Sequence, residues 1–190
     1  MSGLKIRIYK TPIAKIVLLG DAAVGKTTLR NIYLGKGFKT VYMPTIGADV
    51  GTRKIQIGGK TFEFQIWDLA GQPHFTAVRT LYYGGTSGAI LMYDVSRPDT
   101  LSNLKSWIRE LYSHSNKKIV ALSVIGNKTD LRKSEKNTIT TQEGLEFVEG
   151  LIEERGSTTW INFLETSLKE NPNADEVFQT FGEAVFERQT

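Results

Sequence analysis

Cysteine is absent from the sequence, and histidine occurs only at His74 and His114. The lack of cysteine excludes disulfides, thiolate metal sites, cysteine nucleophiles and cysteine-linked lipid anchors within these 190 residues. Two histidines without any cysteine also argue against a structural zinc site.

Long apolar runs are missing as well. No apolar stretch approaches the roughly 18 residues that a membrane-spanning helix needs, and charged residues occupy the N-terminal region where a secretory peptide has its apolar segment. The first glycine stands at Gly3 rather than at the second position, so the myristoylation pattern is missing too. We therefore expect a cytoplasmic protein without a direct lipid anchor, whose membrane association, if any, uses a partner or a segment outside this sequence.

A strong excess of one charge is also absent, because 24 lysines and arginines face 20 aspartates and glutamates and the basic residues are dispersed. We therefore expect no nucleic-acid partner.

The chain has 190 residues and 40% hydrophobic content, enough for one well-filled core and too little for two ordinary domains. We expect one domain over residues 13–190, monomeric, after an N-terminal extension over residues 1–12 that either adds to a sheet edge or forms a mobile arm.

Apolar periodicity predicts strands that alternate with helices. The strands are expected near 14–19, 48–57, 61–67, 88–94, 119–125 and 161–165, and the helices near 26–34, 98–114, 141–155 and 174–188. Alternation of this kind is typical of a parallel sheet with helices on both faces. Gly58-Gly59 between two alternating segments predicts a hairpin, which makes one edge strand antiparallel.

A glycine-rich segment connects the first predicted strand to the first predicted helix. Glycines allow the backbone N–H groups to point toward one centre, the helix adds its positive end, Lys26 can reach terminal phosphates and Thr27 can hold magnesium. An ordinary glycine turn would leave Lys26 and Thr27 without a reason. The segment therefore predicts a nucleotide phosphate site formed by Gly20, Ala22, Ala23, Val24, Gly25, Lys26, Thr27 and Thr28.

A second motif, Asp68-Leu69-Ala70-Gly71-Gln72, follows the strand predicted near 61–67. A carboxylate at the end of a strand can face the phosphate loop, because ligands of open α/β sheets bind beyond the carboxyl ends of the strands. Asp68 would then hold magnesium through a water, Gly71 would offer its N–H to a terminal phosphate, and Gln72 would lie beside an attacking water. Taken singly, Asp68 could instead cap a turn and Gln72 could be a solvated loop residue.

A third motif, Asn127-Lys128-Thr129-Asp130, follows the strand predicted near 119–125. Asp130 can accept hydrogen bonds from the N1–H and the exocyclic amine of guanine, a donor pair that adenine does not present. Asn127 would tie this loop to the phosphate loop, and the aliphatic stem of Lys128 would cover one face of the base. The motif therefore favours guanine over adenine.

With these residues the chain resembles the Ras-superfamily small GTPases, most closely the Rab branch, over residues 13 to 186. The resemblance implies an α/β fold of the P-loop NTPase class, a small G domain whose mostly parallel six-stranded sheet has one antiparallel edge strand and helices on both faces. It further implies that Thr45 binds magnesium and senses the γ-phosphate, and that Tyr42 closes over the phosphates. Around guanine it implies contacts from Phe38, Ser167, Leu168 and Lys169, with Ser167 bracing Asp130 and the Leu168 N–H meeting the guanine oxygen.

The resemblance also implies the reaction, the hydrolysis of GTP to GDP and phosphate with Mg²⁺ as cofactor. Its catalytic residues would be Gln72, Lys26, Gly71 and Thr45. No arginine that could act on the γ-phosphate from within the chain is evident, although Arg79 lies in the second switch region. The expected partners are an exchange factor, a GTPase-activating protein and effectors, bound through residues 40–47, Val50, Trp67 and residues 72–82.

Two other classes stay open at this point. One is a guanine-nucleotide-bound scaffold or interaction module that does not hydrolyse GTP, and the other is an adenine-specific P-loop enzyme. Thr45, Asp68 and Gln72 favour a hydrolysing switch over a scaffold, and Asp130 argues against adenine. Leu168 replaces the usual alanine, and Pro73 stands where an acidic residue is common, so we expect a stiffer start of the second switch.

Overall fold

One six-stranded sheet runs through the part of the chain that the computed structural model describes, residues 11–38, 43–116 and 118–188. The strand order is β2-β3-β1-β4-β5-β6, and all neighbours are parallel except β2 and β3. The strands are β1 (Ile13–Leu19), β2 (Ala48–Ile57), β3 (Lys60–Leu69), β4 (Thr86–Asp94), β5 (Ala121–Asn127) and β6 (Trp160–Thr166). This confirms the predicted mostly parallel sheet with one antiparallel edge strand.

The antiparallel edge is the hairpin predicted from the glycine pair. Ile57 pairs with Lys60, and the two residues between them, Gly58 and Gly59, have φ values of +55° and +76°. A two-residue turn with both central residues in the left-handed region matches the twist of the flanking strands, and glycine enters that region without steric cost.

The helices are α1 (Lys26–Tyr33), α2 (Thr76–Arg79), α3 (Pro98–His114), α4 (Thr141–Arg155) and α5 (Ala174–Glu187). Four of them confirm the predicted helices. The fifth, α2, was not predicted, because its four residues are too few to produce a helical repeat of apolar positions. At the start of α4, Thr140 and Glu143 exchange hydrogen bonds as a capping box, which fixes where that helix begins.

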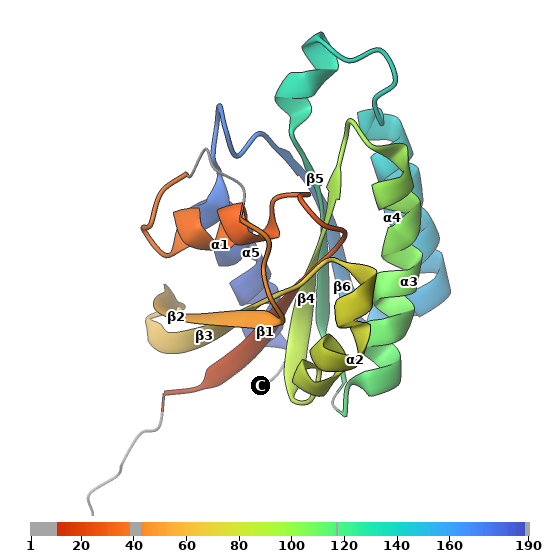
Figure 1. Cartoon of the computed structure of the whole chain (residues 1–190). Coiled ribbons are helices and arrows are strands. Elements are labelled where there is room, and N and C mark those ends of the chain that lie inside the picture. Colours follow the sequence, from red (N-terminus) through yellow and green to blue (C-terminus); the bar gives the residue numbers. More distant parts are fainter. Residues whose placement is uncertain (1–10, 39–42, 117, 189–190) are drawn as a thin grey trace, which may run out of the picture.

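The helices cover both faces of the sheet, as predicted (Figure 1). Successive residues of β1 point to opposite faces, so Ile16 and Leu18 belong to the core under α1 and α5. Val17 and Leu19 belong to the second core, under α3 and α4. Because β1 is buried on both faces, the loop that follows it starts from a fixed point in the middle of the sheet.

The carboxyl ends of β1, β3, β4 and β5 lie at the same edge of the sheet, the edge at which open α/β sheets bind ligands. Tyr42, residues 40–41 of the first switch and residues 1–10 of the N-terminal extension lie outside the described residues. None of the helices in the described ranges is long and apolar enough to cross a membrane.

Candidate nucleotide-binding site

The glycine-rich segment forms a tight loop between β1 and α1, and two of its glycines are required by the space around them. A Cβ on Gly20 would lie 2.1 Å from the main-chain oxygen of Met92, and one on Gly25 would lie 2.2 Å from Asn127 Nδ2. Their φ values are +134° and +114°. Ala23 also adopts a left-handed backbone, with φ +63°, although it has a side chain. The sequence motif gave no sign of this strained position.

Helix α1 begins at Lys26 without a side-chain N-cap. Its first N–H groups therefore face the loop, where an anion can accept hydrogen bonds from them. The ammonium of Lys26 is buried and donates to the main-chain oxygens of Gly20 at 2.7 Å and Asp21 at 2.8 Å. Burial lowers the pKa of Lys26 to about 8, against the opposing charges of Asp68 and Asp21.

Three side-chain oxygens from three separate segments meet beside Lys26. Thr27 Oγ1 donates to Asp68 Oδ2 at 2.5 Å. The hydroxyl of Thr45 lies 3.0 Å from Thr27 Oγ1 and 3.3 Å from the same Asp68 oxygen. Asp68 is fully buried, and burial raises the pKa of its carboxyl despite the hydrogen bond from Thr27 and the charge of Lys26. Its second oxygen, Oδ1, is buried without a hydrogen-bond partner among the described residues. An all-oxygen donor set with spare capacity suits magnesium.

Two pockets at this edge share residues and form one groove. One is lined by Ala22, Ala23, Gly25, Lys26, Thr27, Thr28, Thr45, Gly71 and Gln72. The other is lined by Ala23, Gly25, Thr28, Phe38, Asn127, Lys128, Asp130, Leu131, Leu168 and Lys169. The first set holds most of the residues predicted for phosphates and hydrolysis, and the second holds most of those predicted for the base. Of the predicted residues that the structure describes, four line neither pocket, namely Gly20, Val24, Asp68 and Ser167. Leu131 was not predicted, because its place after the third motif becomes meaningful only in three dimensions.

The base end of the groove is held together by side chains from three loops. Asn127 Nδ2 donates to the main-chain oxygen of Val24 at 2.8 Å, which ties this end to the phosphate loop as predicted. Ser167 Oγ donates to Asp130 Oδ1 at 2.6 Å, the bracing contact that the resemblance implied. The N–H of Leu168 donates to Asn127 Oδ1 at 3.3 Å.

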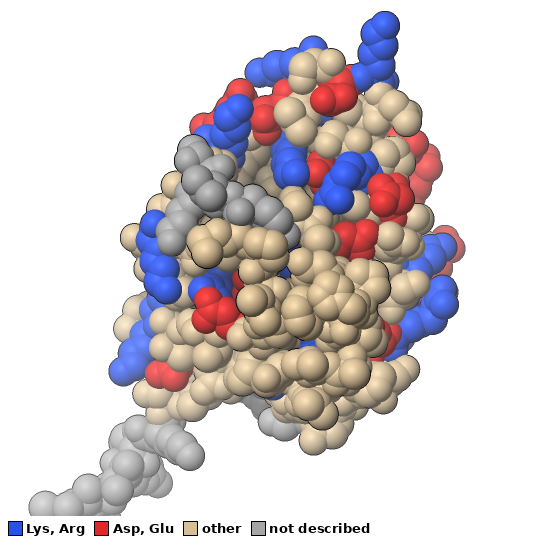
Figure 2. Space-filling view, viewed as in Figure 1, with Lys and Arg blue, Asp and Glu red and all other residues tan. Residues whose placement is uncertain are grey.

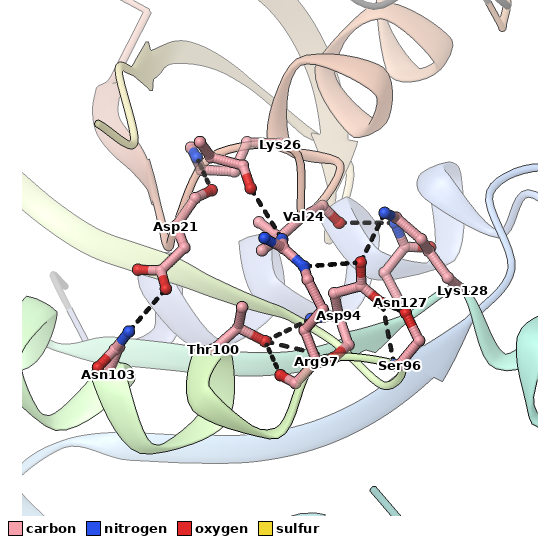
Figure 3. Close-up of polar contacts among 11 residues, drawn as sticks. Asp21, Val24, Lys26, Asp94, Ser96, Arg97, Thr100, Asn103, Asn127 and Lys128 are labelled. Carbon is pink, nitrogen blue, oxygen red and sulfur yellow. Dashed lines mark hydrogen bonds and ion pairs between the residues drawn. The ribbon is translucent and has the colours of Figure 1, made fainter. Parts of the chain in front are cut away.

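Asp94 is a buried aspartate that was not predicted as a site residue, and it holds Lys128 at the base end of the groove. It lies at the end of β4, where its carboxylate accepts from Lys128 Nζ at 2.6 Å, from the N–H and hydroxyl of Ser96, and from Arg97 Nε (Figure 3). Burial alone would raise the pKa of Asp94, but the hydrogen bonds from Lys128 and Ser96 outweigh it and leave the pKa below its usual value. The sequence did contain a signal for Asp94: it is a carboxylate at the carboxyl end of a strand that is buried on both faces.

The second switch approaches the phosphate loop closely. A Cβ on Gly71 would lie 2.5 Å from the main-chain carbon of Asp21, so only glycine fits here. Gln72 lines the phosphate end of the groove, next to Gly71. Arg79 is buried and forms an ion pair with Glu110 of α3, so its side chain is directed toward that helix.

Comparison with known proteins agrees with this geometry. The model of the Ras family matches residues 15–187. The chain is also 37% identical to the Ras-related protein RABA2a of Arabidopsis thaliana over 172 residues, which cover 90% of this chain and 74% of that relative. The match includes the phosphate loop, both switch regions and the guanine motifs, and the fold is that of a P-loop NTPase. The chain therefore belongs to the Ras family and is a Rab-like small GTPase, a switch that binds GTP and hydrolyses it.

Proposed function

We propose that this GTPase holds magnesium-bound GTP in the joined groove and uses Gln72 to orient the water that attacks the γ-phosphate. The observation that carries the proposal is the convergence, at one end of the groove, of Lys26, the Thr27–Thr45–Asp68 oxygens and Gln72. These groups come from three segments of the chain: Lys26 and Thr27 from the start of α1, Thr45 from the first switch, and Asp68 and Gln72 from the motif at the end of β3.

The phosphate end of the groove would act mainly by positioning and by stabilising charge. The Lys26 ammonium would exchange its main-chain acceptors for phosphate oxygens, while the N–H groups of the loop and of α1 would stabilise charge on the leaving GDP. Thr27 and Thr45 would hold magnesium directly and Asp68 through a water, and the ion would neutralise phosphate oxygens when bound. The Gln72 side chain would hold the water in line with the bond that breaks.

The base end of the groove would select guanine. The Ser167 hydroxyl already occupies one oxygen of Asp130, so the carboxylate is held in one orientation before the base arrives. Asp130 would then accept from the two donors on the guanine edge. A site that hydrogen-bonds its ligand in this way can reject an analogue lacking the donors by about 10⁴-fold to 10⁵-fold.

The output of the switch would be a change in partner binding. Loss of the γ-phosphate would release Thr45 and Gly71, and two loops would relax. These loops border a surface of exposed apolar side chains, Ile46, Val50, Val78 and Leu81. Figure 2 shows a broad area free of charged side chains over α2. Trp67 pairs with Val50 across β2 and β3, and its ring lies 5.4 Å from that of Tyr82.

We assign this uncharged surface to the binding of effectors and regulators. Residues 40–47, which lead into it along the chain, would contribute to the same interface. The protein would bind these partners as a monomer. Membrane association, if any, would come through such a partner or through a segment outside this sequence. Because Arg79 is directed toward α3, intrinsic hydrolysis should be slow. A partner that supplies an arginine could add on the order of 10⁵-fold, about 7 kcal/mol of barrier.

The hydrolytic part of the proposal is tested by Gln72→Leu. Protein loaded with magnesium-GTP is mixed with a trap for released nucleotide, and phosphate release is followed in a single turnover. We expect a rate at least tenfold below that of the unaltered protein, with GTP affinity changed by less than about threefold, because the lost group acts on water rather than on bound nucleotide. Gln142→Leu, an exposed change on α4, is the control. An unchanged single-turnover rate would show that Gln72 does not orient the water.

Base selection is tested separately by Asp130→Asn. Xanthine presents a carbonyl where guanine has its amine, so an amide at position 130 should favour xanthine nucleotides over guanine nucleotides. Competition of xanthosine and guanosine diphosphates for the refolded or nucleotide-exchanged protein measures this preference. A preference for guanine that survives the substitution would contradict the role given to Asp130.

A further inference from the structure

The guanidinium of Arg79 connects the start of the second switch, at Gln72, with helix α3. Its Nε and Nη2 donate to the two carboxylate oxygens of Glu110 on α3, at 2.6 and 2.8 Å. Its remaining nitrogen, Nη1, donates to the main-chain oxygen of Gln72 at 3.0 Å. Arg79 is only 5% exposed. This fork of donors therefore holds the backbone of the proposed catalytic glutamine to a helix rather than to solvent.

The same guanidinium lies on the ring of Trp107, 4.1 Å from its centroid. The indole N–H of Trp107 points the other way and donates to Asp21 Oδ1 of the phosphate loop at 2.8 Å. Asn103, one turn earlier on α3, donates to the second oxygen of Asp21, also at 2.8 Å (Figure 3). Because the Asp21 main-chain oxygen accepts from Lys26, a continuous set of contacts runs from the phosphate lysine through α3 to the second switch.

The backbone at Gln72 is restricted from both directions. Gln72 is extended, with φ −78° and ψ 141°, which is the conformation that a following proline demands. Pro73 fixes its own φ, and the Gln72 carbonyl is held by Arg79. Pro73 and Arg79, six residues further along the chain, thus both restrict the start of the second switch. The side chain of Gln72 therefore extends from a main chain with little freedom.

We propose that Arg79 is a positioning residue for hydrolysis: it anchors the Gln72 backbone to α3, and through Trp107 and Asp21 it sets the second switch relative to the phosphate loop. The inference rests on the proposed role of Gln72 and names what holds that residue in place. Arg79 is not among the residues that line the phosphate end of the groove. Its effect on the rate would therefore pass through the residues that it holds, chiefly Gln72, whose carbonyl accepts directly from Arg79.

Arg79→Lys is the informative change. Lysine keeps the positive charge opposite Glu110, but one ammonium cannot pair with both carboxylate oxygens, reach the Gln72 carbonyl and lie flat on Trp107 at the same time. A misplacement of about 1 Å can cost about 10²-fold in rate, so we expect the partial loosening to slow single-turnover GTP hydrolysis about tenfold. GTP affinity should change by less than about threefold, because the phosphate-loop contacts remain.

A double-mutant cycle separates positioning from a merely structural role. The rates of the unaltered protein, Arg79→Lys, Gln72→Leu and the double variant are measured in single turnovers with bound magnesium-GTP. If Arg79 acts through Gln72, adding Arg79→Lys to Gln72→Leu changes the rate by less than about twofold. The inference is overturned if Arg79→Lys alone hydrolyses GTP within twofold of the unaltered protein, or if it slows the Gln72→Leu variant by the same factor.

Controls make each outcome decisive. Arg109→Lys, an exposed change on α3 next to Glu110, should leave rate and affinity unaltered. If Arg79→Lys does not fold, as judged by thermal unfolding, Glu110→Gln takes its place in the cycle, because it weakens the anchor while keeping Arg79 and its carbonyl contact. We then expect a loss of about threefold that again disappears in the Gln72→Leu background. An unchanged rate in Gln72→Leu itself refutes the proposed role of Gln72 and this inference with it, whereas a slow Gln72→Leu beside a normal Arg79→Lys refutes the inference alone.

Discussion

Trp107 donates its indole N–H to Asp21 Oδ1 at 2.8 Å, across 86 positions of sequence. The contact anchors the phosphate loop to α3, the helix on which Arg79 of the second switch also rests. Asp21 lies in the phosphate loop, at a position to which the sequence motif assigns no contact with the nucleotide, and Trp107 lies outside all three motifs. Their pairing joins the phosphate loop to a helix that contributes no residue to the lining of the groove.

The first prediction concerns this pair. Trp107→Phe keeps an aromatic face under Arg79 but removes the donor to Asp21, so we expect the free energy of unfolding to fall by about 1 to 3 kcal/mol. Urea denaturation at a fixed excess of GDP measures the change. Trp160→Phe, where the ring contacts Phe181 from the edge strand β6, is the matched control for lost ring area. Equal losses in the two variants would mean that the hydrogen bond to Asp21 contributes nothing measurable.

The second prediction concerns the glycine at the end of β1. Gly20→Ala would place a Cβ 2.1 Å from Met92 O on a backbone with φ +134°. Because both the clash and the backbone strain involve main-chain atoms, we expect a loss of at least about 3 kcal/mol in the free energy of unfolding. Gly150→Ala is the control, since no atom lies within 4 Å of its added Cβ in α4, and it should be neutral or stabilise by up to about 1 kcal/mol. Similar urea midpoints for the two variants would contradict the steric argument.

The third prediction is a pH dependence that comes from Glu110. Burial alone would raise the pKa of this carboxyl, but the hydrogen bonds from Arg79 and Tyr83 outweigh it and hold the pKa below its usual value. The unfolded chain therefore binds the proton more tightly than the folded protein. The stability due to Glu110 is fully present above the unfolded-state pKa, near 4.3, and is lost as the pH falls through the lower folded-state pKa.

Glu110→Gln should remove this contribution. We expect it to lower the free energy of unfolding by about 3 kcal/mol at pH 7, because the buried Arg79 keeps its charge and loses its partner, and to flatten the acid slope below about pH 5. Urea denaturation at pH 7, 5 and 4 measures both effects. Glu153→Gln, an exposed change on α4, should follow the unaltered protein at every pH. A Glu110→Gln variant with the full acid slope would show that the lowered pKa has no consequence for folding.

Much of the fold was predictable from the sequence because it follows from local patterns. Doubly buried strands such as β5 have near-continuous apolar sequences, and Gly58-Gly59 specifies a tight hairpin without reference to the rest of the chain. Most of the predicted site residues were equally accessible, since each motif follows a strand and the carboxyl ends of parallel strands meet at one edge. The structure accordingly places residues from each of the three motifs in the lining of the two adjoining pockets.

The supporting contacts were not predictable, because they join residues far apart in sequence. Arg79 meets Glu110 across 31 positions, and Lys128 meets Asp94 across 34. An arginine in the second switch can equally well point to the nucleotide or away from it, and only the position of α3 decides. Helix α2 was missed because its four residues are too few to show a helical repeat, and its last residue, Arg79, is held by contacts with Glu110 and the Gln72 carbonyl outside the helix.

The last prediction concerns Leu168, which stands where the family usually has alanine. Its side chain is only 2% exposed and belongs to the core under α1 and α5, while its N–H faces Asn127 at the base end of the groove. Side chain and backbone therefore have separate tasks.

Leu168→Ala should lower the free energy of unfolding by about 2 to 3 kcal/mol through the cavity it leaves, yet reduce GDP affinity by less than about tenfold, because the N–H remains in place. Leu145→Ala, at an exposed position on α4, should cost less than about 1 kcal/mol. Urea denaturation at a fixed excess of GDP and titration with a fluorescent GDP analogue measure the two quantities independently. Loss of GDP binding without loss of stability would place the Leu168 side chain, rather than its backbone, in contact with the base.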